Sequence, residues 1–127
     1  MKLDRGTFDT MPLSLITTRT VDAIGALLGG DVNVLRFRPN LVVEALGGVA
    51  FPEDTWVGRV LTVGTTWIRI DGRDKRCVVV NVDPVTGRRD PTVLRTIAGH
   101  RETCLGVYGS TVRPGRVAVG DSVVLQP

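Results

Sequence analysis

Cys77 is the residue whose surroundings most favour chemistry, because it directly follows the two cations Lys75 and Arg76. A nearby positive charge favours the thiolate over the thiol, and the thiolate is the form that attacks sulfur or ligates a metal. Residues 71–75 are polar and turn-like, which places Cys77 near the mouth of a strand. The competing interpretation is a small buried hydrophobic residue at the start of an apolar strand, and residue type alone favours it.

The second cysteine, Cys104, lies between Thr103 and Leu105 and has no cation beside it. It is therefore predicted to be a strand or core residue, and a thiol reagent is expected to reach Cys77 but not Cys104. His100 is predicted to lie on the surface after a helix, and the sequence offers no second histidine for a metal. Gly-rich phosphate loops, metal-spaced Cys/His sets and serine triads are absent from the sequence.

Residues 36–40, Arg-Phe-Arg-Pro-Asn, are the second segment that could bind a ligand. Pro39 favours a rigid corner, on which Arg38 presents a fork of donors and Asn40 an amide. That pair suits a phosphate or the edge of a pterin ring. The alternative is a charged loop in which Pro39 only interrupts a strand ladder.

Glu53 and Asp54 resemble a pair of catalytic carboxylates. Neighbouring residues on an extended segment point to opposite faces, so a shared acid and base role is not expected. The sequence instead predicts that one of them caps or pairs locally and that Trp56 packs into the core.

The composition describes one ordinary globular domain. The chain has 127 residues, 43% of them hydrophobic and 23% charged, and a net charge of +3. No apolar run of membrane-spanning length and no secretory signal is present. Two isolated cysteines indicate reduced thiols in the cytoplasm. Aromatic residues do not interleave with basic ones, so nucleic acid is not an expected partner.

Two short helices are predicted. Residues 19–28 have apolar side chains at helical spacing, a possible cap at Thr17 or Thr18, and two glycines at the end. Residues 91–98 begin with a proline after Asp90, which is the expected N-cap.

The remaining segments favour strands. Glycines separate several of them, and residues 57–63 and 66–70 flank a predicted hairpin turn. The predicted strands are residues 32–37, 41–44, 57–63, 66–70, 77–82, 104–108, 116–119 and 122–125. This many short strands predict a mainly β fold, a closed or nearly closed β-barrel with two or three short helices.

In this order and at these distances, the motifs resemble the MOSC domain, the molybdenum cofactor sulfurase C-terminal domain. The resemblance is greatest to the branch that contains the mitochondrial amidoxime-reducing components, and it runs from about Phe8 to Leu125. The segments that carry it are Pro-Leu-Ser-Leu-Ile-Thr at 12–17, Arg-Phe-Arg-Pro-Asn-Leu-Val-Val at 36–43, Glu-Asp-Thr-Trp at 53–56, Arg-Cys at 76–77, Val-Asp-Pro-Val-Thr-Gly at 82–87, Tyr-Gly at 108–109 and Gly-Arg-Val-Ala-Val-Gly-Asp at 115–121.

The resemblance implies a MOSC-type barrel that binds the molybdenum cofactor, molybdopterin. Cys77 would ligate molybdenum, with Arg76 beside it, and Arg38 and Asn40 would make polar contacts with the cofactor. Thr17 and Thr18 would lie near its phosphate, where a helix N-terminus offers backbone N–H groups.

Two departures from the family bear on cofactor binding. Many relatives carry a cysteine three residues before the ligand, where this chain has Asp74. Longer relatives also have an N-terminal β-domain that helps to hold the cofactor phosphate, and residues 1–127 are predicted to be a single MOSC domain without it. We therefore expect the isolated chain to fold stably and to bind the cofactor weakly.

Three functions compete at this point. The first is part of a molybdenum-dependent oxidoreductase that acts on a small N-hydroxylated substrate, with electrons from a separate donor. The second is a sulfur carrier with a persulfide on Cys77, loaded by a separate cysteine desulfurase that would hold any pyridoxal phosphate. The third is a β-barrel interaction module without chemistry. A reactive Cys77 serves both of the first two.

Overall fold

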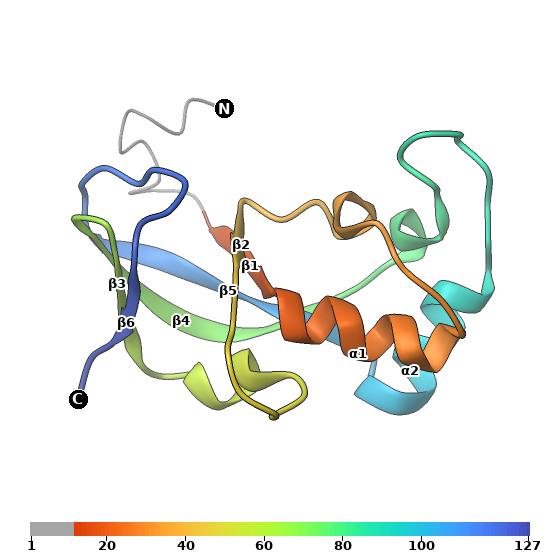
Figure 1. Ribbon diagram of the computed structural model, residues 1–127, viewed down its shortest axis with the longest axis horizontal. Coiled ribbons are helices and arrows are strands. Elements are labelled where there is room, and N and C mark those ends of the chain that lie inside the picture. The colour runs from red at the N-terminus through yellow and green to blue at the C-terminus, as the bar shows by residue number, and fades with distance from the viewer. Residues whose placement is uncertain (1–11) are drawn as a thin grey trace.

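The computed structural model describes residues 12–127, which form one curled sheet with two α-helices packed at one end (Figure 1). The strands are β1 (Leu13–Thr17), β2 (Leu41–Val43), β3 (Val60–Val63), β4 (Thr66–Lys75), β5 (Cys104–Arg113) and β6 (Val123–Leu125). The helices are α1 (Thr18–Leu28), α2 (Thr92–Arg101) and three 3-10 helices, η2 (Val34–Phe37), η3 (Pro52–Trp56) and η4 (Val78–Asn81).

The sheet is mainly antiparallel and has the order β2-β1-β5-β4-β3-β6, with one parallel pair, β1 and β2. The expected hairpin is present, because β3 and β4 pair from Val63 and Thr66 outward. The long strands β4 and β5 form the centre of the sheet, and the mainly β prediction is confirmed.

The predicted closure of the barrel is wrong: the sheet is an open half-barrel. Its two edge strands, β2 and β6, have three residues each and do not pair with one another. A cavity of about 760 Å³ lies between them, and core residues such as Trp56 and Leu61 reach its wall.

Two apolar clusters hold the described residues together. One fills the concave side of the sheet and is built from alternate residues of the strands, such as Leu15, Leu61 and Ile70. The other joins the sheet to the helices through residues such as Ile16, Ile24 and Ile97. Trp56 packs against the first cluster, as expected from the sequence.

Both α-helices form where the sequence predicts them. Thr17 caps α1 by accepting a hydrogen bond from the N–H of Thr20, and Gly29 ends the helix in the left-handed region. Helix α2 extends three residues beyond the predicted end at residue 98. Asp90 accepts hydrogen bonds from the N–H and the hydroxyl of Thr92, although Pro91 holds the cap position.

Four local predictions are wrong. Residues 34–37 and 78–81 are 3-10 helices, not strands, and residues 116–119 are not a strand. Residues 71–75 continue β4 and are not a turn. The β-branched run after Cys77 cannot extend the sheet, because Lys75 already pairs with Cys104, the first residue of β5. Beyond that point no strand partner remains for it.

Within residues 12–127, no helix has both the length and the apolar character that crossing a membrane requires.

Candidate functional site

Cys77 lies two residues after the end of β4, and it is exposed. On one side, the N–H of Arg76 donates to the carbonyl of Thr103 at 2.8 Å, next to the register pair Lys75 and Cys104. On the other side, the carbonyl of Cys77 accepts from the N–H of Val80 at 3.2 Å, where η4 begins. The backbone is therefore fixed before and after an open thiol, as a nucleophile or metal ligand requires.

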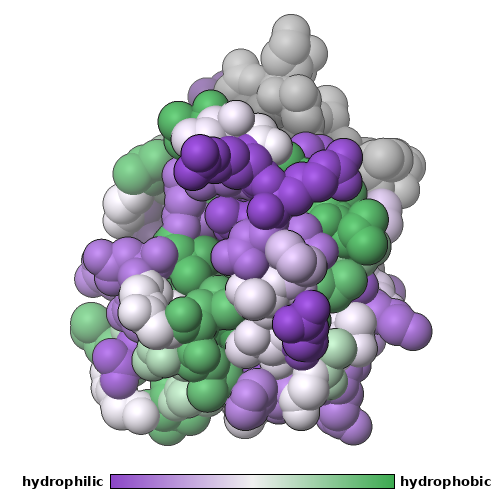
Figure 2. Space-filling view, turned by 90° about the vertical axis from the view of Figure 1, so that its right-hand side faces the viewer, coloured by the Kyte–Doolittle hydropathy of each residue, from purple (hydrophilic) through white to green (hydrophobic). Residues whose placement is uncertain are grey.

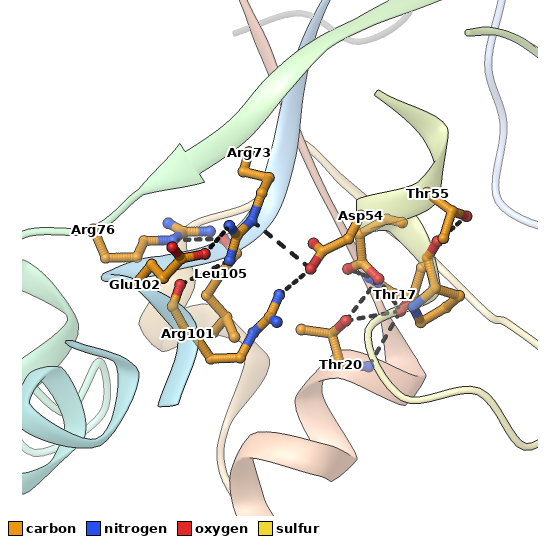
Figure 3. Close-up of polar contacts among 11 residues, drawn as sticks. Thr17, Thr20, Asp54, Thr55, Arg73, Arg76, Arg101, Glu102 and Leu105 are labelled. Carbon is orange, nitrogen blue, oxygen red and sulfur yellow. Dashed lines mark hydrogen bonds and ion pairs between the residues drawn. The ribbon is translucent and has the colours of Figure 1, made fainter. Parts of the chain in front are cut away.

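Arg76 is anchored inside the fold. Its side chain is 10% exposed, and its guanidinium donates from Nε to the carbonyl of Leu105 at 2.9 Å and from Nη1 to the carbonyl of Phe37 at 2.8 Å (Figure 3). Its Nη2 lies 3.4 Å from the carboxylate of Asp74. Burial lowers the pKa of Arg76 and raises that of Asp74, and the attraction between their charges partly offsets both shifts. These bonds are internal, so direct contact of Arg76 with a cofactor stays a prediction.

Arg38 is exposed on the predicted corner, where its backbone takes the left-handed conformation with φ 49°. Since its neighbour Phe37 accepts the bond from Arg76, one buried guanidinium fixes both the corner that carries Arg38 and the backbone beside Cys77. Arg38 forms no ion pair with another of residues 12–127, and an exposed guanidinium suits an anion.

Asn40 has a contact that the sequence did not reveal. Its side-chain oxygen accepts from the N–H of Ser14 at 2.8 Å and its own N–H donates to the carbonyl of Ser14 at 3.0 Å. These bonds join the start of β2 to β1, so Asn40 stabilises the parallel pair. A contact between its amide and a ligand stays a prediction.

Thr17 and Thr18 lie where β1 passes into α1, as predicted, but their hydroxyls are engaged. Thr17 is fully buried and its hydroxyl donates to Glu53 Oε1 at 2.8 Å. The Thr18 hydroxyl accepts from the N–H of Ala45 at 3.3 Å. A phosphate contact by the Thr17 hydroxyl would require its bond to Glu53 to open, whereas the Thr18 hydroxyl, which accepts from Ala45, could still donate. The predicted role of both residues stays untested.

Glu53 is the main residue that sequence reasoning placed poorly. It is completely buried and accepts three hydrogen bonds, from the N–H and hydroxyl of Thr17 and from the hydroxyl of Thr20 (Figure 3). A carboxylate at a helix N-terminus is stabilised by the helix dipole as well as by these donors. The partners lie 33 to 36 positions away in the sequence, so no local signal could have revealed them.

Asp54 points the other way and pairs with two arginines. Its carboxylate accepts a hydrogen bond from Arg101 at the end of α2 and lies 3.8 Å from Nε of Arg73 on β4 (Figure 3). Arg73 also donates to Glu102, and this bond raises the pKa of Arg73 and lowers that of Glu102. The two neighbouring carboxylates thus tie η3 to α1, α2 and β4 through separate sets of partners.

Apolar and cationic side chains surround the exposed cysteine in the sequence. Val78 and Val79 of η4 are 62% and 37% exposed, and Lys75 is exposed on the other side. Figure 2 shows the end of the molecule that carries the segments after β4, where apolar and polar patches adjoin. Such a surface fits a ligand with an apolar part and a negative charge.

No cluster of three or more metal-ligating side chains occurs among residues 12–127. Side chains in this part of the chain would therefore supply fewer than three ligands to a metal at Cys77. A thiolate is a soft ligand, which suits such a metal.

Comparison with known proteins places this site in context. The sequence profile of the MOSC domain matches residues 4–124. The chain is 32% identical over 126 residues to mitochondrial amidoxime-reducing component 1 of Danio rerio, a match that covers 91% of this chain and 37% of that protein. It is 29% identical over 114 residues to molybdenum cofactor sulfurase of Caenorhabditis briggsae, with 88% of this chain and 16% of that protein covered.

A solved structure shows the same fold. YiiM from Geobacillus stearothermophilus superposes with a TM-score of 0.69 at 15% identity, over 91% of this chain and 54% of that one. The chain thus spans less than two fifths of the length of the curated relatives above and about half of this structural neighbour.

Proposed function

Because this chain belongs to the MOSC domain family, we propose that it binds the molybdenum cofactor and that Cys77 supplies the protein ligand to molybdenum. The observation that carries the proposal is the open thiol of Cys77, fixed by backbone bonds on both sides. Similarity to a mitochondrial amidoxime-reducing component and to a molybdenum cofactor sulfurase supports it.

The donor set suits this group in two respects. A thiolate is the soft ligand that molybdenum accepts from a protein, and a single exposed cysteine leaves room for a ligand that brings its own sulfurs. The exposed guanidinium of Arg38 suits an anionic part of the cofactor. We propose that the role of Arg76 in the site is to fix the position of Cys77 relative to the corner that carries Arg38.

When bound, the cofactor would supply the two-electron chemistry that removes oxygen from an N-hydroxylated compound, as the similarity to amidoxime-reducing components suggests. Cys77 would hold the group, and Val78 and Val79 would border the approach of an apolar substrate. Electrons would come from a separate donor. The proposed location is the cytoplasm, which the two unpaired thiols support.

A second function, sulfur transfer, is favoured by the same thiol and by the similarity to a molybdenum cofactor sulfurase. In that role Cys77 would carry a persulfide and pass its outer sulfur to the cofactor or another acceptor. A separate cysteine desulfurase would load it, and any pyridoxal phosphate would belong to that partner.

Metal and pterin analysis tests the cofactor proposal. The chain is purified from a host that makes the cofactor, together with Cys77→Ser and, as the matched control, Cys104→Ser. Because the isolated chain is expected to bind the cofactor weakly, we expect molybdenum and pterin to copurify below full occupancy with the native chain and with Cys104→Ser. The molybdenum should be lost from Cys77→Ser.

The same samples separate the alternatives. Intact mass after growth with a cysteine desulfurase would reveal one added sulfur on Cys77, without molybdenum, if the chain is a carrier. If the samples contain neither molybdenum nor an added sulfur, both proposals are overturned. The remaining alternative is then an interaction module without chemistry.

A further inference from the structure

The strand register brings the second cysteine near the first, although 27 positions separate them in the sequence. Cys104 opens β5, and its Cα partner on β4 is Lys75. The next residue of the ladder, Arg76, donates its N–H to the carbonyl of Thr103. Cys77 follows it, one step beyond this last bond.

The two cysteines lie on the same face of the β4–β5 pair. Side chains two residues apart on an extended chain lie on the same face, so Cys77 lies on the same face as Lys75. Lys75 is the register partner of Cys104, which therefore lies on that face too. The other face carries Asp74 and Arg76, whose side chains pair at 3.4 Å. Lys75 and Cys77 are both exposed, as this alternation requires.

We propose that Cys77 and Cys104 form a reversible dithiol–disulfide pair, with Cys77 as the thiol that is oxidised first and Cys104 as the thiol that resolves it. Their exposures set these roles, because Cys77 is open to an oxidant and Cys104 is half-buried. Disulfide formation would withdraw the thiol on which cofactor binding or sulfur transfer depends.

The chemistry balances with a peroxide as the oxidant. The Cys77 thiolate attacks one oxygen of hydrogen peroxide, an S–O bond forms as the O–O bond breaks, and the other oxygen leaves as hydroxide, which becomes water; the sulfur is then a sulfenic acid. The Cys104 sulfur then attacks it, the S–S bond forms, and the hydroxyl leaves with a proton as water. The pair has lost two electrons, which a dithiol reductant returns.

The backbone at Cys77 permits the approach of the two sulfurs. Diagonal neighbours on adjacent strands have Cα atoms about 7–8 Å apart, slightly beyond the upper limit of about 6.8 Å for a disulfide. Cys77 lies outside the ladder, between the bond of Arg76 to Thr103 and the first turn of η4. A small shift at this junction, without unpairing of β4 from β5, would close the gap.

Peroxide treatment of the purified chain, without cofactor, tests the proposal. We expect a monomer that is lighter by two hydrogen atoms, a digest in which the peptides of Cys77 and Cys104 are joined, and full reversal by dithiothreitol. After oxidation, the native chain should show no more alkylation at position 77 than the Cys77→Ser variant does. The Cys104→Ser variant should instead accumulate sulfinic acid on Cys77.

Sulfinic acid on Cys77 of the native chain at the same rate as in Cys104→Ser would overturn the proposal, and so would disulfides formed only between two chains. Because the digest of the native chain is sufficient, the test does not depend on the folding of a variant. Its failure would leave the cofactor proposal intact, since no cofactor is present in the experiment.

Discussion

Nη1 of Arg76 donates to the backbone carbonyl of Phe37 at 2.8 Å, and this bond joins two segments 39 positions apart in the sequence. Arg76 precedes Cys77, and Phe37 precedes Arg38. Nε of the same guanidinium holds Leu105 on β5 at 2.9 Å, so the two candidate ligand-binding segments are attached to the centre of the sheet by one side chain. Arg76, which the sequence places beside the proposed metal ligand, thus forms hydrogen bonds that connect segments inside the fold.

Arg76→Met should lower the free energy of unfolding by about 3 kcal/mol, because it removes two charge-assisted hydrogen bonds from a mostly buried site. The free energy of unfolding of Arg76→Lys should lie between those of Arg76→Met and the native chain, since an ammonium lacks the fork that reaches both carbonyls. Denaturant unfolding measures both. Equal stability of Arg76→Met and the native chain would contradict the internal role.

Arg38→Ala should change the free energy of unfolding by no more than about 0.5 kcal/mol, because the side chain is exposed. It should nevertheless reduce the molybdenum and pterin that copurify with the chain. Arg113→Ala, which removes another exposed arginine, is the control for a general effect of charge. A large loss of stability with unchanged cofactor content would assign Arg38 to the fold.

Asn40→Ala, unlike Arg38→Ala, should lower the free energy of unfolding. Its side-chain oxygen accepts from the N–H of Ser14 within the β1–β2 pair. Removing it leaves a part-buried donor without its partner, which costs about 1–3 kcal/mol. Chemical denaturation would measure the loss, and a stability equal to that of Arg38→Ala would show that the bond contributes little.

Sequence reasoning succeeded where the information is local. The cap at Thr17, the glycine end of α1 and the hairpin between β3 and β4 all depend on residues within a few positions. The ordered motifs predicted the MOSC family, which the match over residues 4–124 confirms.

It failed where distant partners decide. Residues 78–81 have the β-branched composition of a strand, yet β5 begins at Cys104 and offers no further edge to pair with. The closure of the barrel depends on whether β2 and β6 meet, which no segment of the sequence reveals. The direction of Glu53 likewise depends on Thr17 and Thr20, which lie on another element.

Stability should fall in acid, partly through Asp83. Backbone N–H groups of Val85 and Thr86 donate to its carboxylate and hold its pKa below the usual value. A group whose pKa is depressed by folding stabilises the protein fully above its unfolded pKa, and this contribution is lost as the pH falls through the folded value. Melting temperatures measured from about pH 6 down to about pH 2 should therefore decrease, with a smaller decrease for Asp83→Asn.

Glu53→Gln tests whether the buried carboxylate organises the start of α1. The carboxylate accepts all three bonds, whereas a glutamine amide must turn its NH2 group either toward the N–H of Thr17, which can only donate, or toward the hydroxyls of Thr17 and Thr20, which must then reorient to accept. Loss of one such bond in a fully buried site should cost about 1–3 kcal/mol. Glu44→Gln, at an exposed position, should change stability by no more than about 0.5 kcal/mol.

Thr20→Val removes one donor to Glu53. The double variant Glu53→Gln with Thr20→Val should lose less stability than the sum of the two single losses, because both substitutions act on one bond. Strict additivity, measured by denaturant unfolding of the four chains, would show that Glu53 and Thr20 do not depend on each other.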